Sequence, residues 1–84
     1  MKFKLNKGFV IQKLDNRTVV FDGDKSVLYT FNDSASYIFT KIKAGWETER
    51  IIDQMVKKYP ISLERAKKDF SGLVSDLKKK KILA

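Results

Sequence analysis

Carboxylates, hydroxyls and lysines must supply any chemistry in this chain, because its 84 residues include no cysteine and no histidine. Their absence excludes thiolate sites and nucleophile–histidine catalysis, and leaves a zinc site only carboxylates. Asp22 and Asp24 flank a glycine, but the spacing and terminal glutamate of a calcium loop are missing, so we expect a plain turn. Asp69 and Asp76 lie about 10 Å apart on a helix, too far for a paired-carboxylate site. We therefore expect no enzyme, no metal and no cofactor.

Basic residues gather in the last third of the chain. The formal net charge is +8, and residues 57–81 contain nine basic and three acidic residues, a net +6. Such a surface attracts nucleic acid, an acidic peptide or a membrane surface, although a solvated lysine-rich helix face explains it equally. No apolar run is long enough for a signal peptide or for the ~18 residues of a membrane span. We expect a cytoplasmic protein without a membrane partner.

The elements that must position any site fall into two halves, strands first and helices after, in one domain spanning residues 1–84. β-branched and aromatic residues predict strands over residues 8–14, 17–21 and 26–31. Asp15-Asn16 and Asp22-Gly23-Asp24 are turn signals, and short turns make neighbouring strands antiparallel. The pattern predicts a three-stranded β-meander. In its third strand we expect Val27, Tyr29 and Phe31 to face the core. Leu28 and Thr30 lie on the opposite face.

Three helices are predicted after the meander. Asn32, Asp33 or Ser34 caps the first, Thr48 caps the second, and the third begins near Ser62. Gly45 ends the first helix and Pro60 the second. Each helix has an apolar stripe at helical spacing; that of the third comprises Leu63, Ala66, Phe70, Leu73, Val74 and Leu77. We expect Trp46 to cover the core, and Ile82 and Leu83 to fold back on it. The fold class is α+β, resembling a winged helix-turn-helix.

Gly72 stands inside the third predicted helix, where glycine costs about 1 kcal/mol relative to alanine. Either the helix packs closely on another element at this point, or a ligand needs the room. We expect close packing.

Two binding functions fit these elements. The first is DNA binding, since three helices beside a small sheet and a basic surface are typical of a winged helix. The third helix, however, offers Arg65 and lysines but no Asn or Gln to read base edges. The second is peptide binding, in which a peptide adds as a strand to an exposed sheet edge beside a helix. Composition alone hardly separates the two.

One motif resembles a known family. The run Phe31-Asn32-x-Ser34-Ala35-x-x-Ile38-Phe39 is similar to the signature of PqqD-like proteins, also called recognition elements of ribosomally synthesised and post-translationally modified peptides. The resemblance continues over residues 8–83 through Gly45-x-x-Thr48, Ile52, Tyr59, Asp69, Val74, Leu77 and Ile82-Leu83. The chain departs from the family pattern at four positions, which carry Phe31, Ala44, Ile51 and Lys81.

The resemblance implies a leader-peptide-binding protein, a peptide chaperone that presents a precursor peptide to modifying enzymes. In the family the leader adds to the third strand and lies against the third helix. Carried onto this chain, the strand residues are Ser26, Val27, Leu28, Tyr29, Thr30 and Phe31. The helix residues are Lys67, Lys68, Phe70, Ser71, Gly72, Val74 and Ser75. Phe70 and Val74 fit a plain core role equally well.

The implied partners are a precursor peptide, whose acidic residues the lysines would attract, and a modifying enzyme such as a radical SAM protein or a leader peptidase. The product would be pyrroloquinoline quinone, a lasso peptide or a radical-SAM-modified peptide. An open edge strand also allows a homodimer, through strand pairing or a domain swap. A winged-helix DNA-binding protein is the alternative function.

Overall fold

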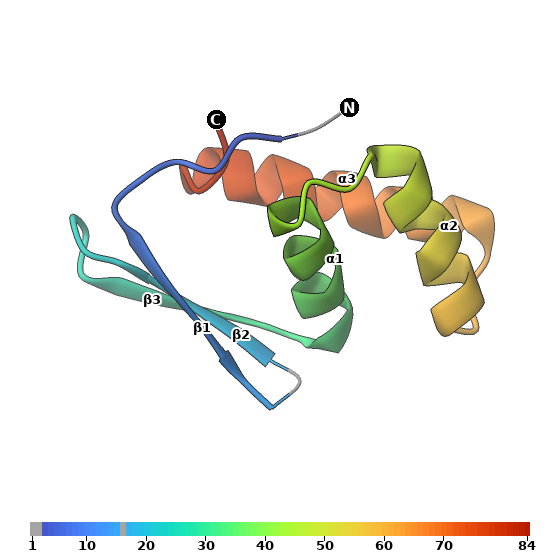
Figure 1. Ribbon diagram of the computed structural model, residues 1–84, viewed down its shortest axis with the longest axis horizontal. Coiled ribbons are helices and arrows are strands. Elements are labelled where there is room, and N and C mark those ends of the chain that lie inside the picture. The colour runs from blue at the N-terminus through green and yellow to red at the C-terminus, as the bar shows by residue number, and fades with distance from the viewer. Residues whose placement is uncertain (1–2, 16) are drawn as a thin grey trace.

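The computed structural model describes residues 3–15 and 17–84. Three strands are followed by three helices, which confirms the predicted α+β order (Figure 1). The strands are β1 (Phe9–Leu14), β2 (Arg17–Asp22) and β3 (Val27–Phe31). The helices are α1 (Asp33–Lys43), α2 (Thr48–Lys58) and α3 (Leu63–Lys79).

The sheet is the predicted antiparallel meander, with β2 in the centre and β1 and β3 at its edges. The turn before β3 is held by Asp22, whose buried Oδ1 accepts the N–H groups of Asp24 and Lys25 at 3.0 and 3.2 Å. Ser26, expected in the third strand, belongs to this turn instead, because its φ of 55° is left-handed rather than extended. Asp15 is also left-handed (φ 56°), as a turn residue should be, while its predicted partner Asn16 lies outside the described residues.

The helix boundaries follow the capping signals. Asn32 Oδ1 accepts the N–H of Ala35 at 2.9 Å, and Ser62 Oγ accepts that of Arg65 at 3.1 Å. The predicted cap of the second helix is wrong by one residue. Glu47 occupies the N-cap, because its backbone is extended while its carbonyl already accepts the first helical bond, from Ile51 N–H. Gly45, with φ 84°, ends the first helix as predicted.

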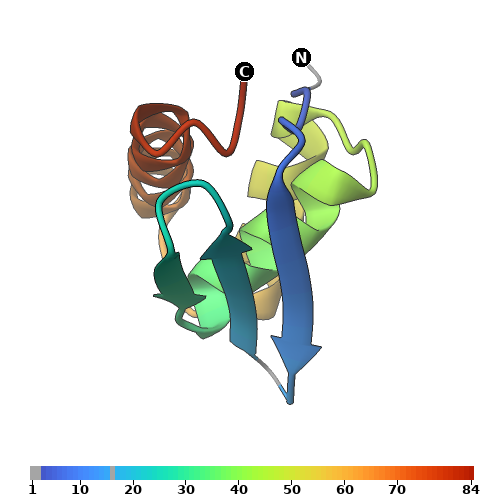
Figure 2. The same ribbon diagram turned by 90° about the vertical axis from the view of Figure 1, so that its left-hand side faces the viewer.

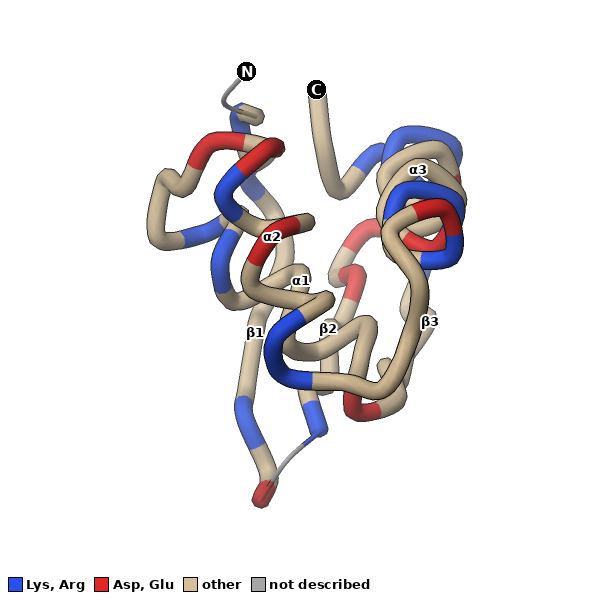
Figure 3. The backbone as a smooth tube through the Cα atoms, turned by 90° about the vertical axis from the view of Figure 1, so that its right-hand side faces the viewer, with Lys and Arg blue, Asp and Glu red and all other residues tan. Residues whose placement is uncertain are grey.

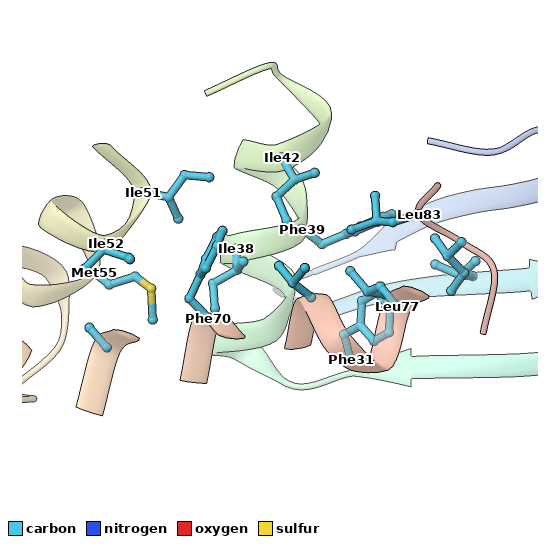
Figure 4. Close-up of a cluster of buried hydrophobic side chains, with 14 residues drawn as sticks. Phe31, Ile38, Phe39, Ile42, Ile51, Ile52, Met55, Phe70, Leu77 and Leu83 are labelled. Atoms are coloured by element: carbon cyan, nitrogen blue, oxygen red, sulfur yellow. The ribbon is translucent and has the colours of Figure 1, made fainter. Parts of the chain in front are cut away.

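The core joins one face of the sheet to all three helices (Figure 4). Phe31 and Phe39 meet edge to face with ring centroids 5.3 Å apart. Ile82 and Leu83 are buried, as predicted, and Trp46 packs partly buried against the core with the Arg50 guanidinium 3.8 Å from its ring centroid. Leu63 was wrongly assigned to the core stripe: in the first turn of α3 it remains 48% exposed.

The N-terminal segment lies beside the C-terminal end of the chain (Figure 1). Leu5 and Leu83 form an antiparallel bridge, Asn6 N–H donates to Ile82 C=O at 2.9 Å, and Ala84 N–H donates to Lys4 C=O at 2.9 Å. These bonds join the two end segments of the chain, and the carbonyl of Leu77 in α3 accepts the N–H groups of Ile82 and Leu83. The pairing was not predicted, because residues 3–6 show no strand pattern of their own.

The helices cover only one face of the sheet, and β3 is the edge strand on the side of α3 (Figure 2). On the outer face Val10, Phe21 and Leu28 lie directly across from one another and are 40–60% exposed. Within the described residues, the fold therefore leaves the edge of β3 near α3 unpaired.

Candidate functional site

A hydroxyl group at the end of β3 shows which backbone groups of this strand point toward β2. Ser36 Oγ accepts the N–H of Thr18 at 2.7 Å and donates to the carbonyl of Phe31 at 3.3 Å, so these two backbone groups of β2 and β3 point toward each other. Backbone direction alternates along an antiparallel ladder. Phe31, Tyr29 and Val27 therefore turn their polar groups toward β2, and Leu28 and Thr30 turn theirs outward, where no further strand of the described chain lies.

The side chains of β3 alternate between the two faces of the sheet. Phe31 is buried and Tyr29 is half-buried on the helix side, as predicted, while Val27 at the strand's start remains 38% exposed. Leu28 and Thr30 point to the outer face, away from α3. A strand added at this edge would meet the backbone of Leu28 and Thr30, and on the helix side it would pass Tyr29.

Next to this edge lies a groove of about 390 Å³ between the start of α1 and the middle of α3. Ala35, Ile38 and Leu73 give it apolar walls, and Lys68 and Asp69 stand at its rim. Asn32 and Ser34 close its end, with the Asn32 carboxamide already committed to capping α1. The groove is a small apolar recess at the point where β3 turns into α1.

The seven residues predicted on the third helix divide between two faces of α3. Lys68 and Gly72 line the groove beside β3. The others line a second groove of about 740 Å³, formed with Phe3 and α2 on another side of α3; they are Lys67, Phe70, Ser71, Val74 and Ser75. Successive helical residues are rotated by about 100°, so one strand cannot contact all seven. Phe70 and Val74 are also buried in the core, 4% and 9% exposed.

Three residues of α3 on the β3 side and the C-cap residue Lys80 were not predicted for the site. Asp69 pairs with Arg65 Nε at 3.1 Å, and Asp76 pairs with Lys80, whose Nζ lies 5.2 Å from the Tyr29 ring centroid. Leu73 forms part of the groove wall. One helix face beside the core stripe carries Asp69, Leu73, Asp76 and Lys80, which are spaced by three or four residues. This spacing is visible in the sequence and could have identified the face. The carboxylates of this face are thus neutralised within the helix.

Basic residues outnumber acidic ones along α3, five to three (Figure 3). Within the described chain, Lys68 takes part in no ion pair, so its charge is available to a ligand at the groove beside β3. An acidic residue near such a cation gains a modest attraction, because the pair stays exposed to water and is screened by salt.

Within residues 3–15 and 17–84 no cluster of acidic side chains could hold a metal ion. Burial raises the pKa of the Tyr59 phenol, with further contributions from Asp33 and Tyr37, so the phenol stays neutral at physiological pH and makes a poor base.

None of the helices in the described part of the chain has the length and apolar run needed to cross a bilayer.

The Ser36 bridge gives a prediction about stability. Ser36→Ala leaves the N–H of Thr18 and the carbonyl of Phe31 buried without their hydroxyl partner, so we expect a loss of about 1–3 kcal/mol in the free energy of unfolding. Urea denaturation measures it. Ser34→Ala is the matched control, since its exposed hydroxyl bonds only the Asn32 side chain, at 3.2 Å. Equal losses in both variants would contradict the bridge.

No curated protein sequence matches the chain. The fold is similar to a solved lasso peptide synthetase B1 complexed with the leader peptide, at 21% identity and a TM-score of 0.92 over 100% of this chain and 99% of that one. It is also similar to TbiB1 in complex with the TbiA(beta) leader peptide, at 19% identity and a TM-score of 0.88 over 99% of this chain and 94% of that one. At these identities the likeness establishes a shared fold.

The sequence itself matches a family model. The model is that of coenzyme PQQ synthesis protein D, and it matches residues 17–83, which include β2, β3 and all three helices. The chain belongs to the PqqD family.

Proposed function

We propose that this protein binds the leader segment of a ribosomally made precursor peptide and presents the peptide to a modifying enzyme. Membership of the PqqD family supports the proposal, and so do two structures of the same fold, both described as leader-peptide complexes. The observation that carries it is the free edge of β3, where the backbone groups of Leu28 and Thr30 point outward beside an apolar groove.

In this proposal the leader adds to β3 as a fourth strand. Main-chain hydrogen bonds to Leu28 and Thr30 supply affinity, and side chains of alternate leader residues reach the groove walled by Leu73. Lys68 and the other lysines of α3 attract acidic leader residues and speed encounter. The protein contributes positioning and no chemical step of its own. Of the residues implied by the family resemblance, the five on the second groove are not required by this geometry.

The setting follows from the same proposal. A precursor peptide is made by ribosomes in the cytoplasm, so we assign the protein to that compartment. Its second partner is the modifying enzyme, of the radical SAM or leader-peptidase type. The winged-helix DNA-binding alternative finds no support in the family match, and on α3 Arg65, the side chain best suited to reading guanine, is paired with Asp69.

A titration followed by NMR tests the function. Isotope-labelled protein is titrated with the leader of the precursor peptide encoded beside its gene, and separately with duplex DNA. We expect the peptide to shift the amide signals of Leu28, Thr30, Lys68, Gly72 and Leu73, because these residues border the proposed strand and groove. Shifts caused only by DNA and centred on the α3 lysines would sink the proposal.

A further inference from the structure

Gly72 has no structural reason to be glycine. A β-carbon built on it would meet no atom within 4 Å outside its own helical backbone, so the expected close packing at this position is wrong. Its backbone is not left-handed either, unlike that of Gly45. Glycine inside a helix nevertheless costs about 1 kcal/mol relative to alanine. The fold itself therefore gives neither a steric nor a backbone reason for glycine at this exposed position.

The space at Gly72 opens into the groove beside β3. Gly72 lies in its α3 wall between Lys68 and Leu73, and faces the α1 wall formed by Ala35 and Ile38. Any side chain at position 72 would project from α3 into this recess. With a volume of about 390 Å³, the groove lies near the lower end of the ~300–1,000 Å³ typical of ligand pockets. It suits one large side chain better than a folded partner.

The geometry of strand addition supplies that side chain. A strand paired with β3 sends every second residue to the helix side of the sheet, the side on which Tyr29 and Phe31 lie. One of these residues would enter the recess where β3 ends and α1 begins. Because Ala35, Ile38 and Leu73 are apolar, the matching residue is branched aliphatic or aromatic.

We propose that Gly72 is the specificity-determining residue of the groove, and that it makes room for one bulky apolar anchor of the leader. This inference rests on the proposed leader-binding function and deepens it. The lack of a side chain at Gly72 lowers the stability of α3 in the free protein. In the complex the leader's anchor occupies the space beside Gly72. Replacing Gly72 therefore has opposite effects on stability and on binding.

Two substitutions test the role of Gly72 by fluorescence anisotropy with a fluorescein-labelled synthetic leader, taken from the precursor encoded beside the gene. Gly72→Ala should raise the melting temperature by roughly 4–8 °C, since alanine favours the helix and meets no atom. It should also weaken leader binding by about fivefold or more, and Gly72→Leu by about 100-fold, because the methyl group takes up part of the space for the anchor and the leucine side chain takes up much more of it. Ala44→Leu adds three carbon atoms, one fewer than Gly72→Leu, at an exposed site outside both grooves and should bind as wild type does.

Paired leader variants identify the anchor. Each apolar leader residue is replaced in turn by alanine, and one replacement should restore much of the affinity lost in Gly72→Leu while weakening binding to wild type. Unchanged leader affinity in Gly72→Leu overturns the inference and leaves the proposed function standing. Weakening that no leader replacement relieves also overturns it. Failure of the wild-type protein to bind the leader overturns the proposed function as well. Melting curves show that each variant is folded.

Discussion

Thr30→Pro is expected to abolish leader binding and to leave the domain folded. The amide of Thr30 points away from β2, so the fold loses no sheet hydrogen bond when proline removes it. A leader strand would lose that bond, worth about 1–3 kcal/mol when its partner is left unsatisfied, or about 5- to 150-fold in affinity. The proline ring also occupies the space through which the leader must approach. Calorimetric titration with the synthetic leader measures the loss.

The opposite edge of the sheet provides a matched control. The same alternation turns the backbone of Lys13 in β1 away from β2, so Lys13→Pro places an equivalent proline on the edge far from α3. We expect this variant to bind the leader as wild type does. Leu28→Pro should behave as Thr30→Pro, since its amide also points outward. Equal affinities in Thr30→Pro and Lys13→Pro would show that the leader does not use this edge.

Much of the fold could be predicted because it depends on local signals. Turn residues such as Asp22, helix caps such as Asn32 and Ser62, and the residue before Pro60 act on backbone groups only a few positions away. The apolar spacing of α1 likewise identified its buried face. The pairing of the two chain ends escaped prediction because it depends on a partner about 75 residues away.

The candidate site was predicted less fully, since a helix pattern shows which residues share a face but not what that face meets. In the structure Lys68 and Gly72 line the groove beside β3, whereas Phe70 and Val74 belong to the core and line the second groove. Gly72 illustrates the limit most clearly. The sequence marks it as unusual, but only the three-dimensional arrangement shows that no neighbour fills its space.

Leu77→Ala is expected to remove about 2–5 kcal/mol from the free energy of unfolding. Leu77 is fully buried in α3 and belongs to the same core cluster as Phe31, so a smaller side chain leaves a cavity there (Figure 4). Its carbonyl accepts the N–H groups of Ile82 and Leu83, at 2.9 and 3.3 Å, and these backbone bonds remain in the variant. The loss would thus report packing alone. A domain of this size is only modestly stable, so urea denaturation should show a large shift of the midpoint.

Leu63→Ala is the matched control for Leu77→Ala, with the same residue types in the same helix. Leu63 stands in the same apolar pattern as Leu77, yet it is 48% exposed and should cost less than about 1 kcal/mol when shortened. Leu63 is the first residue of α3 and is not among the buried core residues, so the periodic pattern continues where the core does not. Comparable losses in the two variants would contradict this difference and mean that Leu63 is buried as deeply as Leu77.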